Sequence, residues 1–159
     1  MGKKFKHLPL RNGVGLVVLN NKNKDFVAKR IDNPKNFWQM PQGGVNQNEN
    51  FLDAARRELE EEMGVKSAKL IKELDGWLKY ELPENLLGKI WRGKYRGQRQ
   101  KWFVMKFTGK DEEINVNTKN PEFLSWKWIK ISELTNIAVS FKLEVYKKLQ
   151  EKLNSLNLN

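Results

Sequence analysis

The sequence predicts an α/β fold, and two kinds of segment carry this prediction. Runs of β-branched and aromatic residues at 13–20, 102–108 and 126–131 are typical of strands. Apolar residues recur at helical spacing in 50–63 and again in 141–153. We therefore expect a β-sheet that is covered by at least two helices.

The length and composition indicate one cytoplasmic domain. A chain of 159 residues can bury a core without cross-links and shows no repeat or linker, so we expect one domain over 1–159 with flexible ends at 1–9 and 154–159. It has no cysteine and a single histidine, His7, which excludes disulfides and argues against a Ser–His triad. No apolar run approaches the roughly 18 residues of a membrane span, and no secretory signal is present. We therefore expect no membrane contact.

The first third of the chain is predicted to be extended. The run at 13–20 ends in a polar turn and extended character resumes over 25–31, which predicts a β-hairpin. After a break at Asn33-Pro34, residues 37–42 are extended, because Pro41 keeps Met40 out of the helical region. The two glycines that follow allow another group to approach the backbone closely.

Both ends of the first helix are marked. Asn48 or Asn50 can cap its N-terminus, and Gly64 is placed to end it in the left-handed conformation. Segment 66–82 is then predicted to be mostly extended. Its candidate inward-facing residues are Leu70, Leu74 and Trp77.

The second half is predicted to contain an irregular basic loop, two strands and a final helix. The loop covers 86–100, and strands follow at 102–108 and 126–131. From Ser140 onward the chain favours an amphipathic helix. Phe141 would belong to the apolar face of that helix.

The net charge is +11, from 30 basic and 19 acidic residues. This balance favours anionic partners, although an AT-rich genome that loads the surface with Lys and Asn would give a similar composition. The charges are segregated, because 85–110 contains basic residues and no acidic one, whereas acidic residues crowd into 49–62. Segregation favours an anionic partner. Segment 93–97 is a candidate contact, with a solvated loop as the alternative.

Three glutamates share one face of the first helix. Glu58, Glu61 and Glu62 fall within an arc of about 100°, whereas Glu60 points away from them. Like charges on one face repel each other unless a cation lies among them, so the pattern favours a metal site. The alternative is a solvated helix face.

The spacing around these glutamates resembles the Nudix box. Gly43 is followed after five residues by Glu49, and after seven more by Arg57-Glu58-Leu59-Glu60-Glu61-Glu62-Met63-Gly64-Val65, and every specified position of the box matches. The resemblance implies an α/β/α sandwich with a mixed sheet between the box helix and a C-terminal helix. It also implies a hydrolase of phosphoric anhydride bonds in compounds that contain a nucleoside diphosphate.

The resemblance further implies the roles of the box residues. Glu58, Glu61 and Glu62 would bind Mg²⁺, with Mn²⁺ or another divalent metal as alternatives, and the catalytic set would be Arg57, Glu58 and Glu61. The structural positions of the box are Gly43, Glu49, Arg57 and Gly64, with Glu49 pairing with Arg57. The general base stays open among Glu58, Glu61 and Glu122.

Other stretches resemble one branch of the family, the bacterial RNA pyrophosphohydrolases and diadenosine polyphosphate hydrolases. They include Trp38-Gln-Met-Pro-Gln-Gly-Gly, Trp77-Leu-Lys-Tyr80, Gly97-Gln-Arg-Gln-Lys-Trp-Phe103, Pro121-Glu-Phe and Ser140-Phe-Lys. The branch implies that Glu122 joins the metal site. The substrate-binding residues that it implies are Arg11, Arg30, Gly43, Gly44, Phe141 and Lys142.

Within this set, Arg30 and Phe141 would sandwich a terminal base, and Arg11 and Lys142 would lie near phosphates. The alternatives are a core role for Phe141 and a plain surface charge for Arg30.

We therefore expect an RNA 5′-pyrophosphohydrolase that converts 5′-triphosphate or diphosphate ends to monophosphate and promotes RNA decay. One alternative is a diadenosine polyphosphate hydrolase. Another, of a different class, is a non-catalytic RNA-binding module, which the intact box argues against. The expected partners are an RNA 5′ end or a nucleoside polyphosphate, with no membrane and no stable protein partner.

Overall fold

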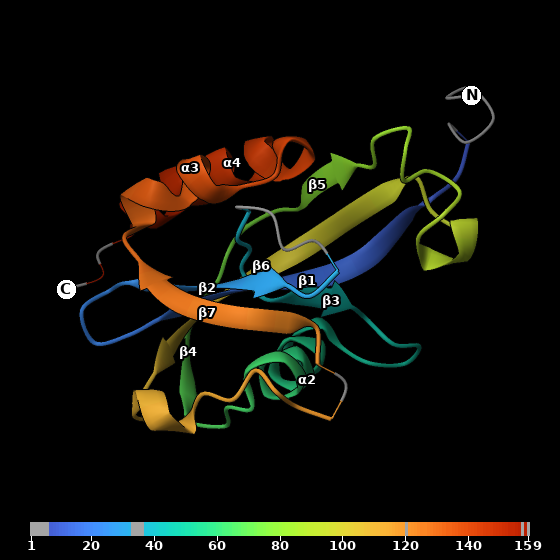
Figure 1. The fold of residues 1–159 in the computed structure, drawn as a ribbon. Coiled ribbons are helices and arrows are strands. Elements are labelled where there is room, and N and C mark those ends of the chain that lie inside the picture. Colours follow the sequence, from blue (N-terminus) through green and yellow to red (C-terminus); the bar gives the residue numbers. More distant parts are fainter. Residues whose placement is uncertain (1–6, 33–36, 120, 157, 159) are drawn as a thin grey trace.

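A mixed β-sheet lies between two helical layers in the computed structural model, which describes residues 7–32, 37–119, 121–156 and 158 (Figure 1). Helix α2 (Phe51–Met63) covers one face. Helices α3 (Leu134–Ile137) and α4 (Leu143–Asn154) cover the other. The predicted sandwich is confirmed. None of the helices in the described ranges is both long and apolar enough to cross a membrane.

The centre of the sheet is a parallel pair of long strands. Strand β1 (Leu10–Leu19) runs parallel to β6 (Gly97–Phe107) in a continuous register from Leu10↔Gly97 to Leu19↔Lys106. The remaining pairings are antiparallel and give the order β4-β6-β1-β2-β7, with β3 on β1 and β5 on β6. The remaining strands are β2 (Asp25–Arg30), β3 (Gln42–Gly44), β4 (Ala68–Glu73), β5 (Leu78–Glu81) and β7 (Phe123–Ile129).

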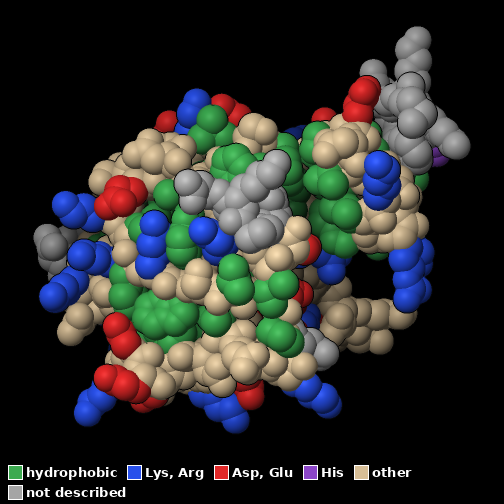
Figure 2. All heavy atoms as spheres, viewed as in Figure 1, with side chains coloured by type: hydrophobic (Ala, Val, Ile, Leu, Met, Phe, Trp, Pro, Cys, Tyr) green, Lys and Arg blue, Asp and Glu red, His purple; other side chains and the backbone are tan. Residues whose placement is uncertain are grey.

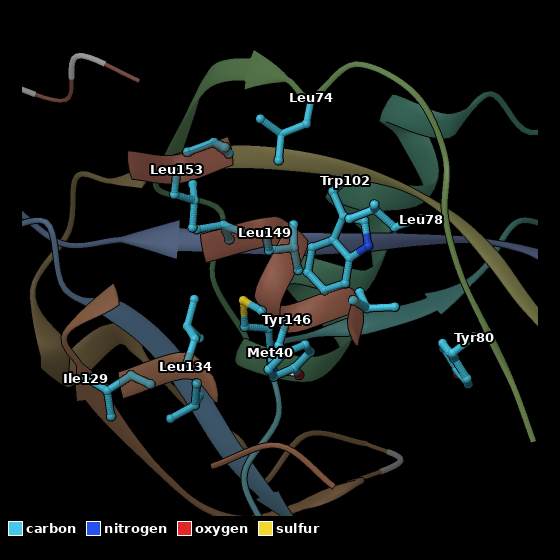
Figure 3. Close-up of a cluster of buried hydrophobic side chains, with 14 of the residues drawn as sticks. Met40, Leu74, Leu78, Tyr80, Trp102, Ile129, Leu134, Tyr146, Leu149 and Leu153 are labelled. Atoms are coloured by element: carbon cyan, nitrogen blue, oxygen red, sulfur yellow. Dashed lines mark hydrogen bonds between the residues drawn. The ribbon is translucent and has the colours of Figure 1, made fainter. Parts of the chain in front are cut away.

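Alternation along β1 divides the core into two layers. Val14, Leu16 and Val18 pack toward α2 with Leu59 and Met63, among others. Val17 and Leu19 belong to the layer on the side of α4. Figure 3 shows this second layer, in which Trp102 and Tyr146 lie among leucines from α4 and β5. Both faces of β1 are thus buried from Gly13 onward, as the apolar sequence of that part predicts.

Both predicted ends of the first helix are confirmed. Asn50, and not Asn48, is the N-cap, and its Oδ1 accepts a hydrogen bond of 2.8 Å from the backbone N–H of Asp53. Gly64 ends the helix at φ 68°. A left-handed residue at this position favours glycine.

Several details from residue 77 onward differ from the expectations. Residues 97–100 were expected in the basic loop but form the start of β6, because Gln98 and Gln100 are buried polar strand residues. Trp77 was expected to face inward but is 39% exposed. Leu74 and Leu78 occupy the core positions on either side of it, and its ring lies against the guanidinium of Arg99, 4.4 Å from the ring centroid.

The final helix begins later than expected. A 3-10 turn spans Ser140–Lys142, and α4 follows it. The flexibility of 1–9 and 154–159 stays a prediction, since residues 1–6, 157 and 159 lie outside the described part of the chain.

Candidate active site

A cleft of about 650 Å³ opens where β1, β3 and α2 meet the segment that leads into α4. Its acidic lining residues are Asp32, Glu58, Glu61 and Glu122, and its cationic ones are Arg11, Arg30 and Lys142. Aromatic, aliphatic and neutral polar residues complete the lining. The lining consists of Arg11, Arg30, Asp32, Phe37, Trp38, Gln39, Gln42, Gly43, Gly44, Glu58, Glu61, Tyr80, Leu82, Leu86, Ile90, Trp91, Glu122, Val139, Phe141, Lys142 and Tyr146.

The cleft gathers the substrate-binding residues that the sequence implied, together with three of the four expected metal ligands. The fourth, Glu62, is 4% exposed and lies behind this surface on α2. Glu49, Arg57 and Gly64 also lie outside the lining. Residues from both ends of the chain therefore meet at one place.

The two glycines of β3 bring charged groups against the backbone. A Cβ atom on Gly43 would collide with the carboxylate of Glu58. A Cβ atom on Gly44 would collide with the guanidinium of Arg11. The glycines thus allow the carboxylate of Glu58, from α2, and the guanidinium of Arg11, from β1, to approach neighbouring positions of β3.

Arg57 ties the loop before α2 to the helix. Its Nε and one terminal nitrogen donate to the two carboxylate oxygens of Glu49 at 2.9 Å each, and the same terminal nitrogen donates to the carbonyl of Gly44 at 2.8 Å. This is the Glu49–Arg57 pair that the resemblance implied. These bonds lower the pKa of Glu49 to about 2, with Arg57 as the main cause and the backbone N–H of Asn46 as the next. The pair fixes β3 with respect to the glutamates.

The other terminal nitrogen of Arg57 reaches two glutamates of the helix. It donates to Glu58 at 2.8 Å and to Glu61 at 3.1 Å. The side chain of Glu61 is 58% exposed, whereas Glu58 is buried. Burial raises the pKa of Glu58 to about 7 even though Arg57 opposes the shift.

Glu62 is the most unusual acid of the site. Both of its carboxylate oxygens are buried without a hydrogen-bond partner among the described residues. Burial raises its pKa well above the ordinary value, and the nearby Glu58 and Glu122 raise it further. Unpartnered buried carboxylate oxygens are costly, so this position calls for a cation.

The donor set fits a hard divalent cation in its chemistry, since carboxylate oxygens are the ligands that Mg²⁺ and Mn²⁺ prefer. Within the described part of the chain, however, no group of three acidic, histidine or cysteine side chains is arranged so that it could hold a metal ion. Arg57 explains part of this arrangement, because it engages Glu58 and Glu61. The site therefore contains suitable types of ligand, but in the described residues no three of them are arranged around one point.

Three cations also line the cleft. Arg11 donates to Gln98 at 3.2 Å and lies 5.2 Å from the ring centroid of Trp91. Arg30 forms a two-bond pair with Asp32, at 2.7 Å for each bond. Lys142 is buried, and burial together with the charge of Arg30 lowers its pKa to about 8.

Phe141 lies between the core and the cleft. It packs against the core layer on the side of α4, and it also lines the cleft beside Tyr80, with 5.7 Å between the ring centroids. A ring in this position can stack on a base without leaving its place in the core.

The sequence reasoning missed the part that Tyr80 and Gln42 play in the cleft. The indole N–H of Trp102 donates to Gln100, Gln100 donates to Gln42, and Gln42 donates to the hydroxyl of Tyr80, at 3.1, 3.1 and 3.2 Å. This chain of bonds leads from the core to the cleft. The stretches that carry the resemblance contain Tyr80 and both glutamines, but no local pattern indicates that these side chains form one chain of hydrogen bonds.

The charged side chains of the predicted basic loop contribute less to the cleft than the charge of the loop suggested. Arg96 pairs with Glu81 at 2.8 Å and donates to the carbonyl of Leu8. Arg99 donates to Asn12 at 2.7 Å. Of this loop, Leu86, Ile90 and Trp91 enter the lining of the cleft.

Comparison with known proteins agrees with this geometry. The family model described as the NUDIX domain matches residues 9–149. An RNA pyrophosphohydrolase of Pelagibacter ubique is 63% identical over 150 residues, which cover 94% of this chain and 95% of that protein. A protein of the same name from Rhodospirillum rubrum is 47% identical over 146 residues, which cover 92% of this chain and 88% of that protein.

Solved structures share the fold at low sequence identity. The dihydroneopterin triphosphate pyrophosphohydrolase of E. coli has a TM-score of 0.68 at 19% identity, covering 92% of this chain and 99% of that one. An Ap4A hydrolase of C. elegans has a TM-score of 0.62 at 18% identity, covering 91% and 99%. The family match spans most of the sequence and includes every residue of the box. The chain therefore belongs to the Nudix family of hydrolases.

Proposed function

We propose that this chain is an RNA 5′-pyrophosphohydrolase, which cleaves an anhydride bond of a 5′-triphosphate or diphosphate end and leaves a 5′-monophosphate. The observation that carries the proposal is that one cleft brings carboxylates together with cationic and aromatic side chains. A 5′-terminal nucleotide offers a partner for each, because its phosphate chain can bind cations and a carboxylate-held metal while its base can stack on an aromatic ring. The identity of 63% to a protein named RNA pyrophosphohydrolase supports the RNA substrate.

The carboxylate part is proposed to hold the divalent metal that Nudix hydrolases generally need. Glu58, Glu61, Glu62 and Glu122 would supply its oxygen ligands. When bound, a divalent cation neutralises phosphate charge and lowers the pKa of a water molecule. The two unpartnered oxygens of Glu62 support this assignment most directly.

The residues of this chain would orient the substrate and accept a proton. Arg11 and Lys142 would bind phosphate oxygens. Phe141 and Arg30 would hold the base between a ring and a guanidinium, a mode of stacking that tolerates any base. A carboxylate that faces the cleft would take the proton of the attacking water, with Glu58, Glu61 and Glu122 as the candidates.

A product assay with RNA labelled at the γ- or α-phosphate tests the proposal. We expect the γ-label to be released as pyrophosphate or phosphate while the α-label stays on monophosphorylated RNA. Glu62→Gln should reduce this release by about 10²-fold or more, because it removes a charged ligand of the metal. Glu60→Gln is the matched control, since Glu60 lies on the same helix and is exposed beside Lys66.

Two outcomes would contradict the proposal. A preparation that hydrolyses diadenosine polyphosphates and leaves triphosphorylated RNA intact would favour the dinucleotide alternative. A preparation that binds RNA and releases no label would favour the non-catalytic one. Equal activity of Glu62→Gln and the wild type would remove Glu62 from the metal site.

A further inference from the structure

Two lysine side chains lie over the ring of Trp38, beside the cleft. The ammonium of Lys29 lies 4.9 Å from the ring centroid, and that of Lys127 lies 4.3 Å from it. The lysines come from neighbouring strands, β2 and β7, whose register pairs Val27 with Lys127 and Lys29 with Ser125. Lys29 and Lys127 are therefore diagonal neighbours on the same face of the sheet.

This cluster of Lys29, Trp38 and Lys127 has no acidic counterpart. Among the described residues, neither lysine forms an ion pair with a carboxylate. The residues outside the described ranges contain no Asp or Glu, so they supply no carboxylate side chain either. Two like charges on one ring repel each other, and an anion that binds between them would relieve the repulsion.

The cluster is continuous with the cleft. Trp38 belongs to the lining of the cleft, and Lys29 directly precedes Arg30, which also lines it. Lys127 is exposed on β7, the edge strand that crosses the face seen in Figure 2, where Lys and Arg side chains are prominent. A chain that leaves the cleft past Arg30 and Trp38 meets these two ammonium groups next.

We propose that the cluster of Lys29, Trp38 and Lys127 binds the backbone of the RNA chain that follows the 5′-terminal nucleotides. The inference rests on the proposed function, since it gives that site a means to prefer an RNA chain over a dinucleotide. The occupant is a single-stranded polyanion, because its phosphates complement two uncompensated ammonium groups. A dinucleoside polyphosphate has no phosphodiester chain beyond its terminal nucleosides, so it would gain no such backbone contact.

The test compares substrate lengths in the double variant K29Q/K127Q. We expect its KM for a 5′-triphosphorylated RNA of about 20 nucleotides to rise about tenfold, with kcat unchanged, because two phosphate contacts are lost. The KM for a 5′-triphosphorylated dinucleotide should change by less than about twofold. The slope of log KM against log salt for the long RNA should fall by about 1.4, since each phosphate contact to a single strand contributes about 0.7.

The control variant is K69Q/K72Q, which removes the same charge from β4, the opposite edge of the sheet, where both lysines are exposed. It should leave both KM values and the salt slope unchanged. An equal rise for long RNA in the two double variants would overturn the proposal, because it would reflect net charge alone. No rise in K29Q/K127Q, or the same rise for both substrates, would also overturn it.

Binding to 5′-monophosphorylated RNA of the same length separates this inference from the proposed function. This measurement needs no hydrolysis, so it applies even if the enzyme leaves triphosphorylated RNA uncut. We expect K29Q/K127Q to bind the product RNA about tenfold more weakly than the wild type does. Unchanged affinity in this assay would remove RNA as the occupant and leave an acidic protein surface as the other candidate.

Discussion

Two adjacent glycines set the spacing between the carboxylates and the cations of the cleft. Gly43→Ala would force the carboxylate of Glu58 away from β3, whereas Gly44→Ala would displace the guanidinium of Arg11. We expect the first change to lower kcat by about 10²-fold, because a small misplacement in a site can have that effect. The second should mainly raise KM.

Steady-state kinetics of the two alanine variants check this prediction, with thermal unfolding as the control for folding. The neighbouring glycines serve as controls for each other, since both substitutions add one methyl group to the same strand. Identical kinetic defects would show that a general distortion of β3 is responsible. Full activity of Gly43→Ala would contradict the role of Glu58.

Lys142 should make substrate binding depend on pH above neutrality. Burial lowers its pKa to about 8, so its positive charge is present below that pH and is lost as the pH rises through it. We expect KM for a short triphosphorylated substrate to rise between about pH 7 and 9. Lys142→Gln should raise KM at pH 7 by about tenfold, since a hydrogen bond to a charged group contributes about 1.5–3 kcal/mol.

Lys142→Arg provides the matched comparison, because arginine stays charged throughout this range. The KM of Lys142→Arg should not change from pH 7 to about 9. The KM of Lys142→Gln should also be independent of pH in this range, but higher than that of Lys142→Arg. A pH-dependent rise that persists in both variants would assign the titration to another group.

At the level of residues, the sequence predicted most of the charged side chains that gather at the cleft, but not their surroundings. The box spacing identified Glu58, Glu61 and Glu62, but a helical angle does not reveal what packs against each one. Glu62 is buried and Glu61 is largely exposed because β3 covers only part of the helix face. Tyr80 enters the site through partners distant in the sequence, which no local pattern contains.

At the level of elements, sequence signals that lie within a few residues of each other were sufficient to predict the bounds of α2 but not the start of β6. Cap residues mark both ends of α2, and their chemistry is local. The sequence at the start of β6 is polar although the strand is buried there. Gln98 and Gln100 are both buried, and Gln100 donates a hydrogen bond to Gln42. Its parallel pairing with β1 joins segments about 90 residues apart and leaves no trace in either strand.

The N-cap of α2 links the stability of this helix to the site. Asn50→Ala removes the side-chain acceptor for the backbone N–H of Asp53, and we expect it to destabilise the protein by about 1 kcal/mol. Asn50→Asp keeps an acceptor and should preserve stability. Urea unfolding monitored by circular dichroism measures both, and an equal loss in the two variants would contradict the capping role.

At the level of the whole molecule, the sandwich follows from the sequence pattern together with the family resemblance, whereas the cleft does not. The apolar strands and two amphipathic helices require two buried layers, and the structure has both. The cleft forms where the layers separate near β3, and its position depends on how the last helix is reached through Ser140–Lys142. The course of this segment depends on tertiary contacts, which the local sequence does not indicate.

The buried carboxylates of α2 should couple metal binding to the stability of the entire fold. Among the described residues, neither oxygen of Glu62 has a hydrogen-bond partner, and its pKa is raised, so its charged form is costly unless a cation is present. Without metal, Glu62→Gln should unfold at the same temperature as the wild type or higher. With Mn²⁺ or Mg²⁺ at about 100 times its Kd, the wild type should gain about 2.7 kcal/mol, which the variant should lack.

Thermal unfolding with and without metal measures this coupling independently of any substrate. Glu60→Gln should gain as much stability from the metal as the wild type does, because Glu60 is exposed on the same helix beside Lys66. A metal-free Glu62→Gln that is markedly less stable than the wild type would show that the carboxylate stabilises the fold by itself. If this variant also kept the full metal-dependent gain, the buried carboxylate would have no part in the metal site.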